Sequence, residues 1–248
     1  MSDARTPLLR TSGLTRRFGG LVAVSDLDLE IHETEILGLI GPNGAGKSTT
    51  FNLISGFIRP SAGRLDVFGQ DCTGWSPTRI SRLGLVRTFQ HGSYLRTMTV
   101  RDNILIGAMH VLARANPAQR HQRVDETATI LGLGPYLGLE AGSLPHGIQR
   151  LVSIAIAFAA RPRLLCLDEP LTGLNQTEVA ATLHVFQQIR REFKTSILLV
   201  EHNMKAVMSV CDRIVVLHHG QHLATGTPAE IRANEKVIAA YLGKRHDK

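Results

Sequence analysis

The sequence predicts an α/β protein with a mostly parallel core sheet. Two observations carry this prediction. Short, continuous apolar segments alternate with amphipathic helical segments along most of the chain, and a glycine-rich loop joins one apolar segment to a helix. Continuous apolar strands are typical of a parallel sheet that helices cover on both faces. Ligands of such sheets bind beyond the carboxyl ends of the strands.

The glycine-rich loop carries the most specific pattern. Residues 41–49 read GPNGAGKST and fit the phosphate-binding pattern G-x-x-x-x-G-K-S/T without a mismatch. An apolar strand at 36–40 precedes this phosphate loop, and apolar residues follow it at helical spacing as far as Ile58, before Pro60. A chance glycine turn would not need this strand–loop–helix context. The sequence therefore predicts a nucleoside triphosphate site.

The chemistry of that site follows from the loop itself. The glycines let backbone N–H groups curl around a polyphosphate, and the next helix points its positive end at the same place. We expect Lys47 to reach the β- and γ-phosphates of ATP and the Ser48 hydroxyl to bind Mg²⁺. The loop residues expected to contact the nucleotide are Gly41, Pro42, Asn43, Gly44, Ala45, Gly46, Lys47, Ser48 and Thr49.

Composition and charge narrow the class of protein. The 248 residues are 43% hydrophobic and 20% charged, as in ordinary globular proteins, and allow one large domain or one domain with an inserted lobe. The net charge of +7 would suit nucleic acid or an anionic membrane surface. Because the basic residues are scattered, a basic solvated surface is the simpler explanation, and we expect no nucleic-acid partner.

Three further features bear on location. The cysteines, Cys72, Cys166 and Cys211, form no C-x-x-C pair, which suits a reducing cytosol. The first residues lack the apolar core of a signal peptide, and the longest apolar run, 154–160, is too short to span a bilayer. We therefore expect a cytoplasmic protein that works at a membrane only through a partner.

The N-terminal part is expected to be rich in strands. Strands are predicted within residues 8–31, with a turn at Gly19–Gly20, and again at 63–69 in the same sheet. Phe18 precedes the turn, where its ring could stack on a base or simply pack in the sheet. A further strand, 84–89, ends at Gln90.

From about residue 95 to 145 the pattern becomes helical. Thr99 with Asp102 forms a possible capping box, and Asn116 is a possible N-cap before Pro117. Because these helices interrupt a series of strands, we expect an inserted helical lobe.

The C-terminal part returns to alternating helices and strands. Its predicted strands are 164–167, 197–200, 213–218 and 221–224, its helices include 146–160 and 179–193, and Thr227–Glu230 is a capping box that opens the last helical segment. Residues Gly41, Gln90, Asp168 and His202 each follow a predicted strand directly or within two residues. We therefore expect the sheet to gather them at one edge.

The residues expected at that edge suit ATP hydrolysis. Asp168 follows four apolar residues, which is typical of a carboxylate that holds Mg²⁺ opposite the loop serine. Glu169 can take a proton from water that attacks the γ-phosphate. The alternative for Asp168 and Glu169 is an ordinary acidic pair at the end of a strand. His202 could contact the γ-phosphate or the attacking water, and Gln90 could contact that water or Mg²⁺. For each of these two residues, a purely structural role is the alternative. A metal site at His218, His219 and His222 is disfavoured because no fourth ligand lies near.

The order of these motifs resembles the nucleotide-binding subunits of ABC transporters over nearly the whole chain. Residues 41–49 resemble the Walker A loop of the family, 164–169 the Walker B strand, Gln90 the Q-loop glutamine, His202 the switch histidine and Phe18 the adenine-stacking aromatic. Residues 144–150 fall at the signature motif L-S-G-G-Q, and 173–175 at the D-loop. The similarity is closest to the branched-chain amino-acid uptake subgroup, as in 17–24, 87–90, 201–205 and 226–243.

The resemblance implies an architecture and a set of partners. It implies one ABC ATPase domain over 1–248, with an N-terminal antiparallel β subdomain and a helical subdomain at 95–148. Two such subunits, identical or different, would enclose two ATP molecules, each between one phosphate loop and the other subunit's signature segment, including Leu144, Gly147 and Gln149. The helical subdomain would pass motion to transmembrane permease subunits, with the protein peripheral on the inner face of the membrane.

Two departures from the family pattern stand out. Pro145 occupies the place of the signature serine and lacks its hydroxyl and a backbone N–H, and His146 replaces a glycine. We expect Gly147 and the helix N-terminus still to serve, with a weaker half-site. Asn175 replaces the D-loop aspartate.

The resemblance implies an Mg²⁺-dependent ATPase of an importer that drives solute transport through separate membrane subunits. The solute is expected to be branched-chain amino acids. Relatives that handle urea, amides or lipopolysaccharide are the alternatives, with a soluble nucleic-acid-associated ABC ATPase as a further one. A binding-only regulator is disfavoured, because Lys47, Asp168, Glu169 and His202 are all present.

Overall fold

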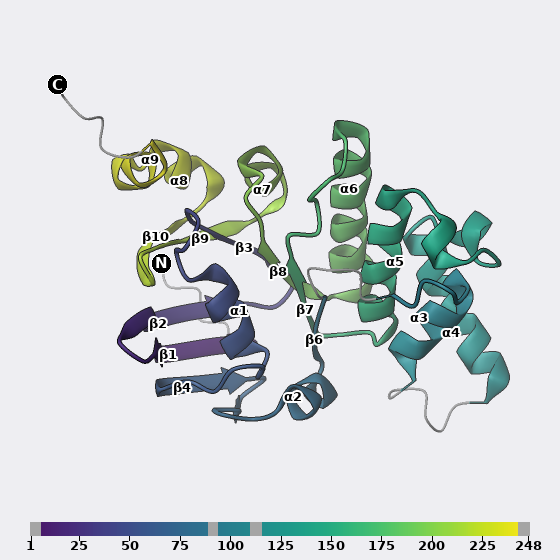
Figure 1. The fold of residues 1–248 in the computed structure, drawn as a ribbon, viewed down its shortest axis with the longest axis horizontal. Helices are drawn as coiled ribbons and strands as arrows, with labels where there is room; N and C mark the ends of the chain where they lie inside the picture. The colour runs from purple at the N-terminus through teal and green to yellow at the C-terminus, as the bar shows by residue number, and fades with distance from the viewer. Residues whose placement is uncertain (1–5, 89–93, 110–115, 243–248) are drawn as a thin grey trace. The chain divides into compact units, whose positions relative to one another are not determined.

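The structure is a computed structural model that describes residues 6–88, 94–109 and 116–242. The chain divides into two compact units. Unit 1 comprises residues 1–83 and 196–248, and unit 2 comprises residues 84–195. Each is described by its own strands and helices (Figure 1).

Unit 1 contains a four-stranded antiparallel sheet near the N-terminus. The strands are β1 (Leu9–Phe18), β2 (Leu21–Ile31), β4 (Ala62–Val67) and β5 (Gln70–Asp71), in the order β2-β1-β4-β5. Within β2, Leu27, Leu29 and Ile31 alternate with more exposed residues, as a sheet with one covered face requires. This confirms the predicted strands before and after the phosphate loop and the turn at Gly19–Gly20.

Unit 1 also holds the parallel strands that carry the phosphate loop. Strand β3 (Ile36–Ile40) lies between β8 (Ser196–Val200) and β9 (Arg213–His218) and is parallel to both, while β10 (Gln221–Gly226) is antiparallel to β9. Every residue of β3 and β8 is buried, which explains their continuous apolar sequences. At the start of β3, the Arg213 guanidinium lies 2.8 Å from the Glu35 carboxylate.

The helices of unit 1 are α1 (Lys47–Ile54), α2 (Pro77–Leu83), α7 (Met204–Val210), α8 (Pro228–Ala233) and α9 (Glu235–Leu242). The predicted helix after the phosphate loop is wrong in its end point, since α1 stops at Ile54 and does not reach Ile58. The reason is Gly56, whose φ of 76° ends the helix and brings its backbone close to the Trp75 carbonyl, where a Cβ would lie at 2.6 Å. The capping box of Thr227 and Glu230 is confirmed at α8.

Unit 2 contains one parallel pair of strands, β6 (Leu85–Arg87) and β7 (Leu164–Asp168), in which Leu85 pairs with Leu164. Its helices are α3 (Val100–Ala108), α4 (Pro117–Ile130), α5 (His146–Ala159) and α6 (Gln176–Phe193), with the short 3₁₀ turns η1 (Gly134–Tyr136) and η2 (Ala141–Ser143). The predicted strand 84–89 is present at 85–87, and its last residue, together with Gln90, lies outside the described residues.

In the helical segment of unit 2, both predicted N-caps are confirmed, Thr99 as an N-cap of α3 and Asn116 as part of a capping box of α4. The Thr99 hydroxyl accepts a hydrogen bond from the Asp102 amide at 3.1 Å, and Asn116 forms a reciprocal capping box with Gln119. A buried side chain, Asn103, ties the segment before α3 to the helix, since its carboxamide oxygen accepts from the Leu95 amide at 2.7 Å. Such buried amide bonds fix one conformation, because leaving them unmade is costly.

The two helices that pack most closely in unit 2 are α3 and α5. Gly107 of α3 lies so near the backbone of Ile156 in α5 that a Cβ there would overlap its carbonyl oxygen. The apolar face of α5 is buried, including Val152, Ala155 and Phe158. Among the residues that the structure describes, no helix combines the length and hydropathy needed to span a bilayer.

Candidate functional site

The phosphate loop connects β3 to α1 in unit 1, as predicted. Two of its glycines occupy positions that exclude a side chain. A Cβ on Gly41 would overlap the Leu217 carbonyl oxygen, and a Cβ on Gly46 would lie 2.7 Å from the Ala23 carbonyl oxygen. Gly46 also has a φ of 98°, in the left-handed region that favours glycine. The backbone of β2 and β9 thus encloses the loop closely.

Lys47 is the first residue of α1 and is 9% exposed. Its ammonium group donates hydrogen bonds to the carbonyl oxygens of Gly41 at 2.7 Å and Pro42 at 3.1 Å. The positive charge is therefore held inside the curve of the loop, beside the positive end of the helix. Ser48 follows it on the exposed side of the first turn. A cation and a hydroxyl at a helix N-terminus form an arrangement suited to a phosphate with Mg²⁺.

His202 stands at the same sheet edge as Gly41. Because Leu39 of β3 is in register with Val200 of the parallel strand β8, the two chains leave the sheet side by side. The His202 side chain is 59% exposed. The preceding Glu201 is 1% exposed, and its carboxylate accepts from the His202 amide at 3.2 Å. Glu201 carries little sequence signal, since only its place between a strand and His202 could have indicated a role.

Phe18 ends β1 in unit 1 with 42% of its surface exposed. The guanidinium carbon of Arg16 lies 4.5 Å from the centre of its ring. The ring is therefore at the surface and not in the sheet interior, so the simpler packing interpretation does not describe it. An exposed ring beside a cation is able to stack on a nucleotide base.

In unit 2, Asp168 is the last residue of β7 and is 6% exposed. Its amide donates to the Thr88 hydroxyl at 3.3 Å, which ties it to the segment after β6. Burial lowers the pKa of the nearby Arg87 guanidinium, and the charge of Asp168 opposes that shift. A buried carboxylate offers the oxygen donors that Mg²⁺ prefers.

Glu169 follows Asp168 with a φ of 47°, which is unusual for a residue other than glycine. Such a conformation costs about 1–2 kcal/mol and is found more often at functional sites. The side chain is half-buried.

The signature segment, residues 144–150, leads into α5 of unit 2 and forms its first residues. Leu144 is extended, Pro145 caps the helix with a φ of −55°, and His146 is its first residue. Gly147 is buried against the Glu178 carboxylate, which would have to shift to admit a Cβ. The proline fits its position, because the first turn of a helix does not use its N–H groups within the helix.

Gln149, which we expected to contact nucleotide, is engaged within unit 2. Its side-chain nitrogen donates to the Leu144 carbonyl at 2.7 Å, and its side-chain oxygen accepts from the Tyr94 hydroxyl at 2.6 Å. These bonds hold the signature loop in place. Asn175 caps α6, since its side-chain oxygen accepts from the Glu178 amide at 3.0 Å. An asparagine caps a helix as well as an aspartate does.

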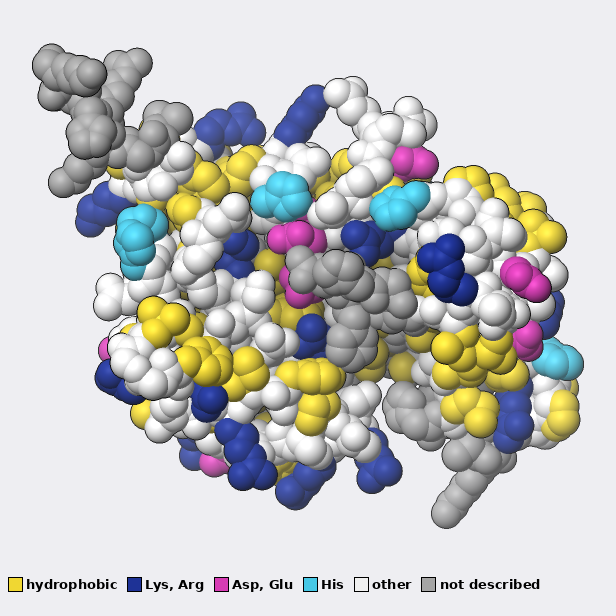
Figure 2. Space-filling model, in the orientation of Figure 1, with side chains coloured by type: hydrophobic (Ala, Val, Ile, Leu, Met, Phe, Trp, Pro, Cys, Tyr) yellow, Lys and Arg dark blue, Asp and Glu magenta, His cyan; other side chains and the backbone are white. Residues whose placement is uncertain are grey.

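The residues from the sequence analysis that remain are Gln90 and the histidines His218, His219 and His222. Gln90 lies outside the described residues. The ring centres of His218 and His219 lie 4.0 Å apart with the ring planes tilted by 58°, while His222 is hydrogen-bonded to Thr225 at 2.7 Å. Within residues 6–88, 94–109 and 116–242, no group of three or more His, Cys, Asp or Glu side chains could hold a metal ion. On the face shown in Figure 2, Lys and Arg side chains occur at many separate places.

Comparison with known proteins shows which family the chain belongs to. The sequence pattern of the ABC transporter family matches residues 24–172, from β2 to the segment after β7. The chain belongs to the ABC transporter family. A second pattern, described as branched-chain amino acid ATP-binding cassette transporter, matches residues 221–247. The resemblance to ABC transporter subunits, and to the branched-chain amino-acid subgroup in particular, is thereby confirmed.

Two groups of curated ABC proteins illustrate the similarity. The high-affinity branched-chain amino acid transport ATP-binding protein LivG of Salmonella typhimurium is 43% identical over 96% of this chain and 98% of its own length. BraF of Pseudomonas aeruginosa, with the same description, is 41% identical over the same shares. The lipopolysaccharide export system ATP-binding protein LptB of Haemophilus influenzae is 30% identical over 96% and 98%.

Solved structures agree with the family. The ADP conformation of MJ1267, an ATP-binding cassette of an ABC transporter, has a TM-score of 0.86 and 27% identity, and the match covers 96% of this chain and all of that one. The predicted α/β fold of an ABC ATPase is therefore confirmed. As a member of this family the chain is an ATP-hydrolysing subunit of an ABC transporter, which confirms the predicted enzyme.

Proposed function

We propose that this ABC ATPase drives the import of branched-chain amino acids through separate permease subunits. The observation that carries the proposal is the 41–43% identity to LivG and BraF over 96% of the chain, together with the C-terminal match at residues 221–247. The identity to LptB is lower, at 30%, which makes lipopolysaccharide export the second candidate.

The proposed nucleotide site is centred on the phosphate loop. Lys47 turns from the loop carbonyls to the β- and γ-phosphates of ATP, while the backbone of residues 41–49 surrounds them and Phe18 stacks on the adenine. Ser48 and Asp168 would hold Mg²⁺ through oxygen atoms, which is the donor type this ion requires, and Gln90 would complete its shell. When bound, Mg²⁺ supplies positive charge that screens the phosphate oxygens.

The proposed chemistry uses two further side chains. Glu169 accepts a proton from the attacking water, and His202 donates a hydrogen bond to the γ-phosphate or orients that water. His202 suits this role because its backbone is anchored by the buried Glu201 while its ring remains 59% exposed. The strained backbone at Glu169 supports a functional role for that residue.

The proposed working form is a dimer with a second ABC ATPase subunit. Leu144, Gly147 and the N-terminus of α5 would face the γ-phosphate held by the other subunit, with Gln149 supporting the segment from behind through its bond to the Leu144 carbonyl. We further propose one ABC ATPase domain over 1–248, with a helical subdomain at 95–148 that contacts the permease. The protein would then lie at the inner, cytoplasmic face of the membrane.

Uptake into vesicles tests the proposed solute. The chain is purified from detergent-solubilised membranes with its permease subunits, reconstituted with ATP and Mg²⁺ inside, and assayed with radiolabelled leucine and the cognate binding protein. We expect ATP-dependent leucine uptake that the Glu169→Gln variant loses. Uptake of urea or an amide but not leucine, or transfer of lipopolysaccharide, would overturn the proposed solute and favour that alternative.

A further inference from the structure

The hairpin formed by β9 and β10 is hydrogen-bonded to the phosphate loop. Its two-residue turn, 219–220, contains Gly220, whose amide donates to the carbonyl oxygen of Ala45 in the loop at 3.1 Å. The Gly220 carbonyl oxygen accepts from the Ser25 amide of β2 at 2.8 Å. Gly220 is buried, so both of its backbone groups take part in joining the hairpin to the loop and to β2.

The backbones come together so closely at this point that no side chain fits between them. A Cβ on Gly220 would lie 2.7 Å from the Ala23 carbonyl oxygen, and a Cβ on Gly46 of the loop would lie 2.7 Å from the same oxygen. That Gly46 Cβ would also lie 3.3 Å from the α-carbon of Gly220. A larger residue at position 220 would therefore have to displace β2 or the hairpin itself.

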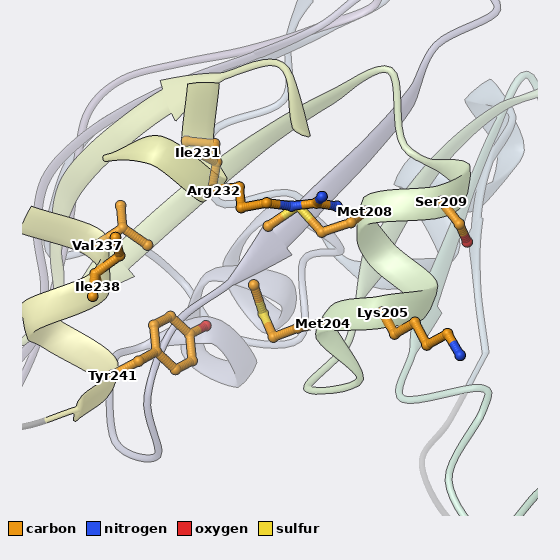
Figure 3. A pocket seen from close by; sticks show the side chains of 9 residues that line it. All are labelled: Met204, Lys205, Met208, Ser209, Ile231, Arg232, Val237, Ile238 and Tyr241. Atoms are coloured by element: carbon orange, nitrogen blue, oxygen red, sulfur yellow. The ribbon is translucent and has the colours of Figure 1, made fainter. Parts of the chain in front are cut away.

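The hairpin is also attached to the C-terminal helices of unit 1. Strand β10 contacts both α8 and α9, which together with α7 border a cavity of about 630 Å³. Figure 3 shows Ile231 of α8 with Val237 and Tyr241 of α9 across this cavity from Met204 and Met208 of α7. Because the hairpin is packed on these helices, it can serve as a fixed support for the loop.

The bond from Gly220 fixes a direction in the loop. The Ala45 carbonyl and the Gly46 N–H belong to one planar trans peptide group, so they point in opposite directions. With the carbonyl held toward the hairpin, the Gly46 N–H points away from it. A loop that surrounds a phosphate with N–H groups turns carbonyls outward, where each needs a donor. Gly220 supplies that donor for Ala45.

We propose that Gly220 is a positioning residue that holds the Ala45–Gly46 peptide group so that the Gly46 N–H is presented to the phosphates of ATP. The β9–β10 hairpin is then part of the nucleotide site, although it lies far from the loop in the sequence. This inference rests on the proposed site at residues 41–49. A loop that spends less time in the binding geometry binds nucleotide more weakly in the same proportion.

The alternative is that Gly220 serves only the hairpin turn. His219 and Gly220 have φ of 50° and 76°, and a type I′ turn requires positive φ at both residues. The β4–β5 hairpin offers a matched control, since Phe68 and Gly69 have φ of 52° and 79° in a turn of the same length. A Cβ on Gly69 would meet no atom of the described residues within 4 Å. Alanine is strained by positive φ at either glycine, but only at position 220 would it also press on the Ala23 backbone.

The first test compares Gly220→Ala with Gly69→Ala in the full chain, by affinity for a fluorescent ATP analogue, thermal melting and ATPase kinetics. For Gly220→Ala we expect affinity to fall at least about 10-fold, the effect of losing one hydrogen bond to a charged phosphate oxygen. Its KM for ATP should rise while kcat changes less than about threefold, as expected when uniform binding is lost. Gly69→Ala should lower affinity less than about twofold, although both variants should melt at a lower temperature. Equal affinities in the two variants would overturn the inference.

The second test uses the parent protein and follows hydrogen exchange of the Gly220 amide by NMR. Saturation with Mg²⁺ and a non-hydrolysable ATP analogue should slow this exchange about 10-fold or more, because nucleotide binds the geometry in which the Ala45–Gly220 bond is closed. The Phe68 amide, which donates to the Leu8 carbonyl at 2.7 Å in the other hairpin, should respond less than about twofold. No response at Gly220, or an equal response of the two amides, would overturn the inference even if Gly220→Ala does not fold.

Lys47→Ala is the reference for the site itself and should weaken nucleotide binding in the same assay. If Lys47→Ala binds nucleotide normally, the proposed site fails and the inference fails with it. If Lys47→Ala loses binding while Gly220→Ala binds as the parent protein does, the site stands and the positioning role is rejected.

Discussion

The ammonium group of Lys47 lies 2.7 Å from the carbonyl oxygen of Gly41, six residues earlier in the chain. This contact closes the phosphate loop on itself and keeps a 9% exposed cation at the N-terminus of α1. A buried cation is costly unless polar groups surround it, and here the loop carbonyls do so. An incoming phosphate can replace those carbonyls as the partner of the ammonium group, and it carries a full negative charge, which they lack.

Lys47→Ala should therefore abolish most ATP hydrolysis. We expect kcat/KM to fall by about 10²–10³-fold, the loss typical when one stabilising donor is removed from a transition state. The fold should persist, because the loop is also enclosed by the backbone of Ala23 and Leu217. Steady-state ATPase assays and circular dichroism check both statements. Activity within tenfold of the parent protein would remove Lys47 from the site.

Glu169→Gln should bind ATP with nearly unchanged affinity but hydrolyse it about 10²–10⁴-fold more slowly, because the amide cannot accept the proton of the attacking water. Glu192→Gln on the exposed side of α6 is a matched control that should behave as the parent protein. Binding by fluorescence and single-turnover hydrolysis separate the two effects. Undiminished turnover in Glu169→Gln would exclude Glu169 as the base.

Pro145→Ser should strengthen the weaker half-site. Serine restores a hydroxyl and a backbone N–H at the N-terminus of α5, and one added hydrogen bond would raise ATPase activity and nucleotide-driven dimerisation by about 5-fold. Pro145→Ala restores the N–H alone and should lie between the two. Analytical ultracentrifugation of hydrolysis-deficient Glu169→Gln versions reports dimerisation. If serine and proline give the same rate and the same dimer fraction, Pro145 is not what limits this half-site.

The buried thiols predict how stability depends on pH. Burial raises the pKa of Cys166 to about 12 and also raises that of Cys211. In the unfolded chain a thiol ionises near pH 8.5–9, so above that range the unfolded state binds fewer protons than the folded state. The free energy of unfolding should thus fall as pH rises from about 9, by at most about 1.4 kcal/mol per pH unit for each thiol.

Urea titrations at pH 8, 9.5 and 10.5 check the thiol prediction. Cys166→Ala should lower stability at every pH but reduce the slope above pH 9, because one titrating group is gone. In the native state at pH 8, neither Cys166 nor Cys211 should react with a thiol reagent, since both are buried. A free energy of unfolding that is flat or rising between pH 9 and 10.5 would contradict the assigned shifts.

Much of the fold could be predicted because its signals are local. The caps at Thr99, Asn116 and Thr227 each involve a partner three residues away, and all three are present. The buried strands β3 and β8 were evident from their continuous apolar residues. The end of α1 was missed because it depends on Gly56 approaching Trp75, a contact that the helical spacing of apolar residues does not reveal.

The same contrast between local sequence signals and tertiary contacts holds for the candidate site. The phosphate loop follows from its pattern, while the bond between Tyr94 and Gln149 joins residues 55 positions apart and could not be read from either one. Roles that depend on tertiary contacts can be assigned only from the structure.

A crystal structure of the Glu169→Gln variant with ATP and Mg²⁺ would show which side chains surround the γ-phosphate. We expect the γ-phosphate within about 3 Å of the Lys47 ammonium group, with the side chain at position 169 facing the same phosphate and Asp168 directed at the metal. ATP bound away from Lys47, or a γ-phosphate that Lys47 contacts while position 169 lies on the far side of the molecule, would contradict it.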